Sequence, residues 1–137
     1  MAKVGSYIHS IAHTGLALNA STTYGTARRH NLNLMQDQYP NGAAFGGRID
    51  NVIIHMNTIA GGATSLTVRL TDDLAGDDII FGDTTATIST GVTTGTQGAV
   101  TIKFDALWGN TNDDLYLFWK TNAGTAVVDT ITVNWME

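Results

Sequence analysis

The 137-residue sequence contains no cysteine, one proline and a single glutamate, Glu137. Without cysteine, neither a disulfide framework nor a thiolate metal site can form. No apolar stretch approaches the roughly 18 residues that a membrane-spanning helix needs, and the stretch from Met1 to Gly15 lacks the apolar run of a signal peptide. We therefore expect a soluble protein that is made in the cytosol and does not contact a membrane.

Charge is also scarce. Charged residues make up 14% of the chain, against about 25% in a typical soluble domain. The net charge is −5 and the isoelectric point is near 5.1. The acids are concentrated in residues 71–137, whereas five of the seven Lys and Arg residues lie in residues 1–70. An acidic chain lacks the clustered cations that nucleic acid requires, so we expect no nucleic-acid binding.

Threonine is abundant, with 21 positions, and is accompanied by many Val, Ile and Gly residues. This composition favours strands over surface helices. Apolar and polar residues alternate with a period of two in residues 65–71, 99–105 and 130–135. Residues 115–120 have the same period with large side chains on both faces, which predicts a strand covered on both sides. Such alternation is typical of half-buried strands in antiparallel sheets, and it places Trp119 and Trp135 in the core.

Gly- and Asn-rich turns separate these segments at short, regular intervals. Further strands are predicted at Ser6–Asn19, Gly47–Thr58, Asp78–Gly82 and Thr85–Thr90. About eight strands without an intervening helical pattern indicate an all-β, antiparallel two-sheet sandwich. A jelly roll is the leading topology, and an immunoglobulin-like sandwich is the alternative.

One domain covering residues 1–137 suits this length. Residues 20–45 depart from the strand pattern, being rich in Ser, Thr, Asn and Gly. Unstructured loops of more than about 15 residues are uncommon in compact domains unless they have a function. This segment is therefore expected to be either a long loop packed over one sheet or an arm that embraces a neighbouring subunit.

Acidic residues cluster in one turn, with Asp72, Asp73, Asp77 and Asp78 around Gly76. Closely spaced carboxylates in a Gly-containing loop are possible calcium ligands. The spacing differs from that of an EF-hand, and Asp and Gly are also the usual residues of turns. A solvated turn without a bound ion is the favoured interpretation, and a calcium site is the alternative.

The remaining chemistry-bearing residues do not form a known catalytic motif. The four histidines are widely spread, and His9 and His13 on one strand would lie roughly 13 Å apart, too far to share an ion. The sequence lacks the motifs of serine hydrolases, zinc proteases and nucleotide-binding proteins. We expect a protein that is not an enzyme and has no cofactor.

Aromatic and basic side chains in loops are the candidates for contacts with a partner. The long loop contains Tyr24, Arg28, Arg29 and Tyr39, and Trp108 lies just before a Gly-Asn turn. Exposed aromatic residues can anchor a protein interface or stack on sugar rings. These five residues are the predicted interface.

The pattern of strand and turn residues in 47–137 resembles that of a group of small virion proteins of tailed bacteriophages. The resemblance lies in the segments 66–73 (LTVRLTDD), 83–87 (DTTAT), 115–126 (LYLFWKTNAGTA) and 132–135 (TVNW). They are similar to jelly-roll head-decoration (cement) proteins and to related sandwich modules of capsids, tails and fibres. No motif in residues 1–46 matches this group.

This resemblance implies a non-enzymatic building block, often a homotrimer, that bridges and stabilises major capsid subunits. It would be assembled in the host cytoplasm and located on the capsid surface of the virion. The alternative is a carbohydrate-binding or receptor-binding sandwich module associated with a tail or fibre.

Overall fold

The computed structural model describes residues 8–25, 27–32, 45–90, 96–111 and 115–136, and the side chains of 8–9, 45–48, 90, 105–111 and 136 are left out of the description. Within these residues every regular element is a β-strand, and none is a helix that could cross a membrane. The strands are β1 (Ile8–His13), β2 (Leu18–Ala20), β3 (Arg29–Asn31), β4 (Phe45–Ala60), β5 (Ser65–Thr71), β6 (Ile79–Thr87), β7 (Ser89–Thr90), β8 (Gly98–Thr111), β9 (Tyr116–Thr121) and β10 (Thr125–Met136).

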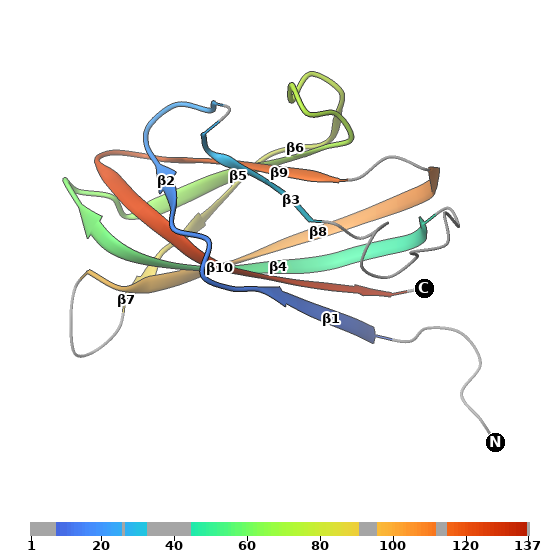
Figure 1. The fold of residues 1–137 in the computed structure, drawn as a ribbon, viewed down its shortest axis with the longest axis horizontal. Helices are drawn as coiled ribbons and strands as arrows, with labels where there is room; N and C mark the ends of the chain where they lie inside the picture. Colours follow the sequence, from blue (N-terminus) through green and yellow to red (C-terminus); the bar gives the residue numbers. More distant parts are fainter. Residues whose placement is uncertain (1–7, 26, 33–44, 91–95, 112–114, 137) are drawn as a thin grey trace.

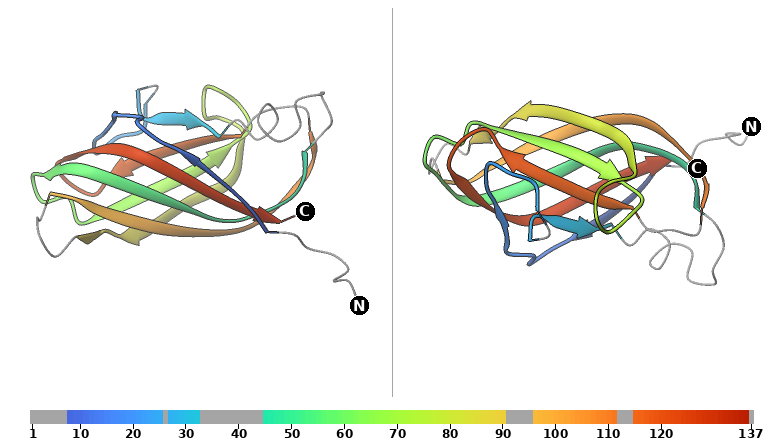
Figure 2. Two further views of the ribbon diagram at one scale, coloured as in Figure 1. Left: turned by 60° about the horizontal axis from the view of Figure 1, so that its bottom comes forward. Right: turned by 90° about the horizontal axis from the view of Figure 1, so that it is seen from above.

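The strands form two layers (Figure 1). One sheet has the order β1-β10-β4-β8-β7, with β2 also paired to β10, and the other has the order β3-β9-β5-β6. Every pairing is antiparallel. Figure 2 shows the long strands β4, β8 and β10 running side by side in the larger sheet. The predicted two-sheet antiparallel sandwich is confirmed.

The pairings are nested, and this nesting defines the topology. The first strand pairs with the last (β1 with β10), and moving inward along the chain β3 pairs with β9, β4 with β8, and β5 with β6. A single long hairpin wound into two sheets in this way is a jelly roll. The predicted jelly roll is therefore confirmed, and the immunoglobulin-like alternative is wrong because its strands do not pair in this nested order.

The core lies between the inner faces of the two sheets. Along β5, the buried Leu66, Val68 and Leu70 alternate with residues that are half-buried. Trp119 and Trp135 are almost completely buried, which confirms their prediction as core residues. The indole Nε1 of Trp119 donates a hydrogen bond of 2.9 Å to the carbonyl oxygen of Asn19, so the polar atom of this large side chain is satisfied.

Strand β9 is covered on both faces, as its sequence pattern predicted. Leu117 and Trp119 face the core, whereas Phe118 faces the other way and is still buried. The turn before β6 covers Phe118, because a Cβ at Gly76 would lie only 2.9 Å from the Phe118 ring. Gly76 also has a φ of 83°, which glycine adopts without strain.

The structure corrects several predicted strand boundaries. The strand expected over 6–19 is interrupted after β1 by a turn in which Gly15 and Ala17 have positive φ angles. The two strands expected over 78–82 and 85–90 are instead one strand, β6, followed by β7 in the other sheet. Within the segment 20–45, β3 forms the edge of the smaller sheet, and residues 26 and 33–44 lie outside the described residues.

The two open sides of the sandwich each carry a ring pair that joins the sheets. On one side, Phe81 of β6 meets Phe104 of β8, with ring centroids 5.0 Å apart and planes at 90°. On the other side, His13 of β1 meets His30 of β3, with centroids 4.7 Å apart and planes at 85°. Edge-to-face contacts of this kind are favourable arrangements of aromatic rings.

Candidate functional site

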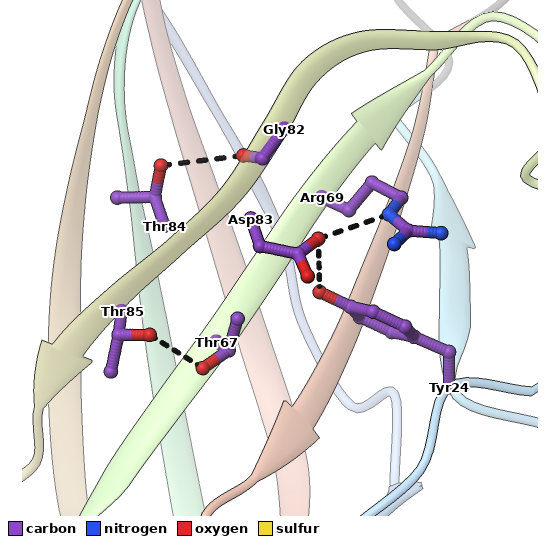
Figure 3. A network of polar contacts seen from close by, with 7 residues as sticks. All are labelled: Tyr24, Thr67, Arg69, Gly82, Asp83, Thr84 and Thr85. Atoms are coloured by element: carbon purple, nitrogen blue, oxygen red, sulfur yellow. Dashed lines mark hydrogen bonds and ion pairs between the residues drawn. The ribbon is translucent and has the colours of Figure 1, made fainter.

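A polar cluster occupies the outer face of the smaller sheet, where the loop before β3 lies against β5 and β6 (Figure 3). The hydroxyl group of Tyr24 donates a hydrogen bond of 2.8 Å to Oδ1 of Asp83. The same oxygen accepts a bond of 3.1 Å from Nε of Arg69. The Tyr24 ring also lies 4.4 Å from the Arg69 guanidinium carbon and 4.7 Å from Nζ of Lys120. Two cations and one carboxylate therefore fix the position of a predicted interface residue.

This arrangement changes the acidity of its members. Burial, followed by the hydrogen bond to Asp83 and the charge of that carboxylate, raises the pKa of Tyr24. Burial alone would raise the pKa of Asp83, but the hydrogen bonds from Tyr24 and Arg69 and the charges of Arg69 and Lys120 lower it overall. Tyr24 is therefore a hydrogen-bond donor and Asp83 an anion throughout the neutral pH range.

A small cavity of about 180 Å³ opens beside this cluster. It is lined by Tyr24, Gly25, Arg69, Ala75, Gly76, Asp77 and Phe118. The lining combines two aromatic rings, one cation and one carboxylate, so it offers both stacking and hydrogen bonding to a small polar group. The cavity is smaller than the roughly 300–1,000 Å³ that drug-sized ligands occupy.

The two predicted interface arginines have different surroundings. Arg28 Nε donates to the carbonyl oxygen of Thr23 at 2.6 Å, and its Nη2 donates to the hydroxyl group of Thr23 and the carbonyl oxygen of Tyr24. Arg28 therefore holds together the loop that carries Tyr24. Arg29 lies on β3, half-buried and paired in register with Phe118.

The structure does not assign the other two predicted interface residues, Tyr39 and Trp108, to this site. Tyr39 lies outside the described residues. Trp108 lies on β8 opposite Gly47 of β4, in the larger sheet, and its side chain is outside the description. A role for these residues in binding a partner stays a prediction, as it does for Tyr24, Arg28 and Arg29.

The acidic turn is organised around the carboxylate of Asp73. Oδ1 of Asp73 accepts a hydrogen bond of 2.9 Å from the backbone nitrogen of Asp78, and Oδ2 accepts one of 3.2 Å from that of Asp77. The backbone hydrogen bond from Asp78 is the largest cause of a lowered pKa at Asp73. The carboxylate thus stabilises its own turn, as Asp commonly does.

No group of three or more His, Asp or Glu side chains that could hold a metal ion occurs in the described part of the chain. Within that part, Asp72, Asp73, Asp77 and Asp78 do not converge on one point. The sequence-based expectation of a turn without a bound ion stays a prediction.

The outer face of the larger sheet is a second candidate surface. Its outward-facing residues form rows across the strands. They alternate with residues that face the core, the buried Val133, Val52 and Ile102 and the half-buried Ile11. The rows are Ser10, Asn134, Asn51 and Lys103; Ala12, Thr132, Ile53 and Thr101; and Thr130, His55 and Ala99. Lys103 carries the only full charge in these three rows, and the other side chains are mostly short.

Some polar side chains on this face form hydrogen bonds with one another. Nδ2 of Asn134 donates to Oδ1 of Asn51 at 2.8 Å, and Nδ2 of Asn51 donates to Oδ2 of Asp50 at 2.7 Å. Toward the other end of the sheet, an open cavity of about 370 Å³ is lined by His55, Met56, Asn57, Ser89, Gln97, Gly98, Ala99 and Asp129. The face therefore carries mostly short side chains, with its charges at Lys103, Asp50 and Asp129, and it is hollowed at one end.

One side-chain pair was missed by sequence reasoning, which compared His13 only with His9 on the same strand. In the structure, Nδ1 of His13 lies 2.6 Å from Nε2 of His30. Burial, followed by the nearby His13, lowers the pKa of His30 from its usual 6.5 to about 4. The alternation of the strands held the available signal. His13 lies on the same strand face as Ile11, and His30 lies on the same strand face as the buried Leu32, so both histidines point inward.

Comparisons with known proteins identify no family for this chain. No family model matches it, and no curated protein matches its sequence. Several solved structures are similar at low identity. Tobacco streak virus coat protein is 10% identical with a TM-score of 0.44, covering 100% of this chain and 89% of that one. The protein FLHE is 12% identical with a TM-score of 0.44, covering 97% of each chain.

A further similar structure is the capsid asymmetric unit of cyanophage Pam1, 12% identical with a TM-score of 0.33, covering 99% of this chain and 89% of that one. The jelly-roll assignment rests on the nested strand pairs of this chain itself.

Proposed function

We propose that the chain is a non-enzymatic structural protein of a virus particle, a decoration or cement protein that bridges and stabilises major capsid subunits. It acts at the capsid surface as a homotrimer and is assembled in the host cytoplasm. The jelly roll occurs in viral capsid domains and in lectins, so the fold permits this role without establishing it.

The observation that carries the proposal is the outer face of the larger sheet. Ile53 lies near its centre, flanked in register by Thr132 and Thr101, and Lys103 is the only fully charged side chain of the three rows. Short, weakly charged side chains lose little conformational entropy and little hydration when a partner covers them. Such a face is suited to packing against another protein subunit.

The test is co-sedimentation with capsids of the virus that encodes the chain, combined with sedimentation velocity of the chain alone. We expect a trimer that co-sediments with capsids. Ile53→Lys should weaken capsid binding at least about tenfold, because it places a charge at the centre of the buried patch. Thr85→Lys, on the exposed outer face of the other sheet, is the matched control and should bind normally.

A monomer that fails to co-sediment with capsids would exclude the proposal. Equal loss of binding in Ile53→Lys and Thr85→Lys would show that the effect is not specific to this face.

A carbohydrate-binding or receptor-binding module of a tail or fibre is the second candidate, favoured by the cavity beside Tyr24 and Arg69. A glycan array tests it directly. Binding that is lost in Tyr24→Ala would support this candidate, and an array without hits would count against it.

A further inference from the structure

We propose that His13 and His30 form a proton-controlled latch, which closes the β1/β3 side of the sandwich when neutral and releases it when both rings are protonated. The proposal concerns the jelly roll itself and does not depend on the partner that the protein binds.

The latch connects the two sheets at their edges. His13 is the last residue of β1, the edge strand of the larger sheet, and His30 is the middle residue of β3, the edge strand of the smaller sheet. Nδ1 of His13 and Nε2 of His30 are 2.6 Å apart, and the two rings are nearly perpendicular. The contact therefore spans from one sheet to the other at a place where no backbone ladder joins β1 to β3.

The chemistry of imidazole makes this contact depend on protons. A neutral ring has one nitrogen that donates and one that accepts, so a neutral pair forms one hydrogen bond. A pair that holds one extra proton also forms one, because one ring still accepts. When both rings are cationic, all four nitrogens are donors, so the two facing nitrogens can no longer bond and two like charges oppose each other.

The surroundings of the pair add to this effect. In register, His13 lies opposite Ile131 on β10, and His30 lies opposite Leu117 on β9. Ile131 and Leu117 are completely buried. A cationic His30 beside this apolar core would lose hydration, so burial favours its neutral ring.

Three charged residues that the structure describes lie on the strands around the pair, and their side chains point away from it. Arg29 is adjacent to His30 on β3 and points in the opposite phase, toward the outer face. Lys120 on β9 lies beside the Tyr24 ring on that same outer face. Asp129 on β10 lines the cavity next to His55, on the outer face of the larger sheet.

The direction of the pH effect follows from the lowered pKa of His30, about 4 in the folded protein against 6.5 for an ordinary histidine. Between these values the unfolded chain binds more protons than the folded one, so stability falls as the pH falls through this window. Above pH 6.5 the contribution of the latch is complete. Asp73 and Asp83 have lowered pKa values and lose their contributions only below their ordinary value of 3.8, outside the window.

The test is urea unfolding of the whole chain at pH 7.5 and pH 4.5, in buffer that contains EDTA so that no metal ion bridges the rings. For the wild type, the equilibrium constant for unfolding should rise at least about tenfold on acidification. His30→Phe should flatten this dependence, because Phe retains an edge-to-face contact without a titrating group. The matched control, His55→Gln on the exposed outer face of β4, should behave like the wild type.

A wild-type equilibrium constant that does not change between these pH values would overturn the proposal, as would His30→Phe with the full wild-type dependence. If His30→Phe does not fold, an NMR titration of the wild-type imidazoles decides. A His30 midpoint below pH 5 supports the latch, and a midpoint near 6.5 excludes it.

Discussion

The two open sides of this sandwich are closed by ring pairs of nearly the same geometry and different chemistry. Phe81 and Phe104 meet at 5.0 Å on the β6/β8 side, and His13 and His30 meet at 4.7 Å on the β1/β3 side. Both contacts are edge-to-face, but the phenyl pair gains its stability from burial of apolar surface, which does not depend on pH. The imidazole pair contributes only while at least one facing nitrogen can accept a proton.

The comparison shows how one fold can place a constant contact and a responsive contact at equivalent positions. In each case one ring comes from an edge strand of the smaller sheet, β6 or β3. The other ring comes from the larger sheet, from its edge strand β1 or from β8, which is next to the short edge strand β7. The side chain at each position then decides whether that side responds to acid.

The largest predicted effect is on the phenyl side. Phe104 is completely buried, so Phe104→Ala should lower the free energy of unfolding by about 3–5 kcal/mol. The loss should be the same at pH 7.5 and pH 5 in urea unfolding. If the alanine variant does not fold, Phe104→Leu should show a smaller loss that is likewise equal at the two pH values. A loss that depends on pH would break the proposed contrast between the sides.

A double variant tests whether the imidazole side can be converted into a phenyl side. In the wild type, His30 accounts for a loss of about 1 kcal/mol between pH 7.5 and pH 5, after allowance for its partial exposure to solvent. His13→Phe combined with His30→Phe should remove this loss. Thermal unfolding at the two pH values measures it, and a double variant that is still destabilised at pH 5 would assign the acid sensitivity to other groups.

The sequence predicted the architecture because strand periodicity is a local property. The alternation around Trp119 and Trp135 and the turns between strands were sufficient to predict a two-sheet sandwich with these residues in its core. The break between β1 and β2 was missed because it depends on the backbone conformation of Gly15 and Ala17.

The candidate sites were less predictable because they join distant residues. Tyr24 was singled out as an exposed aromatic residue, but its partner Asp83 is 59 residues away. His13 and His30 are 17 residues apart and lie on different sheets. The inward phase of each histidine could be read from the alternation, but their contact depends on how the nested hairpin is wound.

A smaller effect is predicted on the outer face of the smaller sheet. Tyr24→Phe removes the hydroxyl group that donates to Asp83 and leaves the ring over Arg69 and Lys120. Because Asp83 retains its bond from Arg69, the expected loss is about 0.5–1 kcal/mol. Urea unfolding at pH 7.5 measures this loss. An effect as large as that of Phe104→Ala would contradict this ranking, because it would mean that one hydroxyl group on the outer face contributes as much stability as a buried ring between the sheets.

The smallest predicted effect is that of calcium. Because the Asp73 carboxylate already accepts two backbone hydrogen bonds within its own turn, millimolar calcium is expected to leave the melting temperature unchanged. Thermal unfolding with and without calcium checks this. A rise in melting temperature that disappears in Asp73→Asn would show that the turn is an ion site.

Strand-resolved hydrogen exchange at pH 7.5 and pH 5 tests the contrast between the two sides most directly. After correction for the intrinsic effect of pH on exchange, amides of β1 and β3 should lose protection at pH 5, whereas those of β6 and β8 near Phe81 and Phe104 should keep it. A uniform loss over all four strands, or no loss on β1 and β3, would contradict the conclusion that one side of the sandwich responds to protons and the other does not.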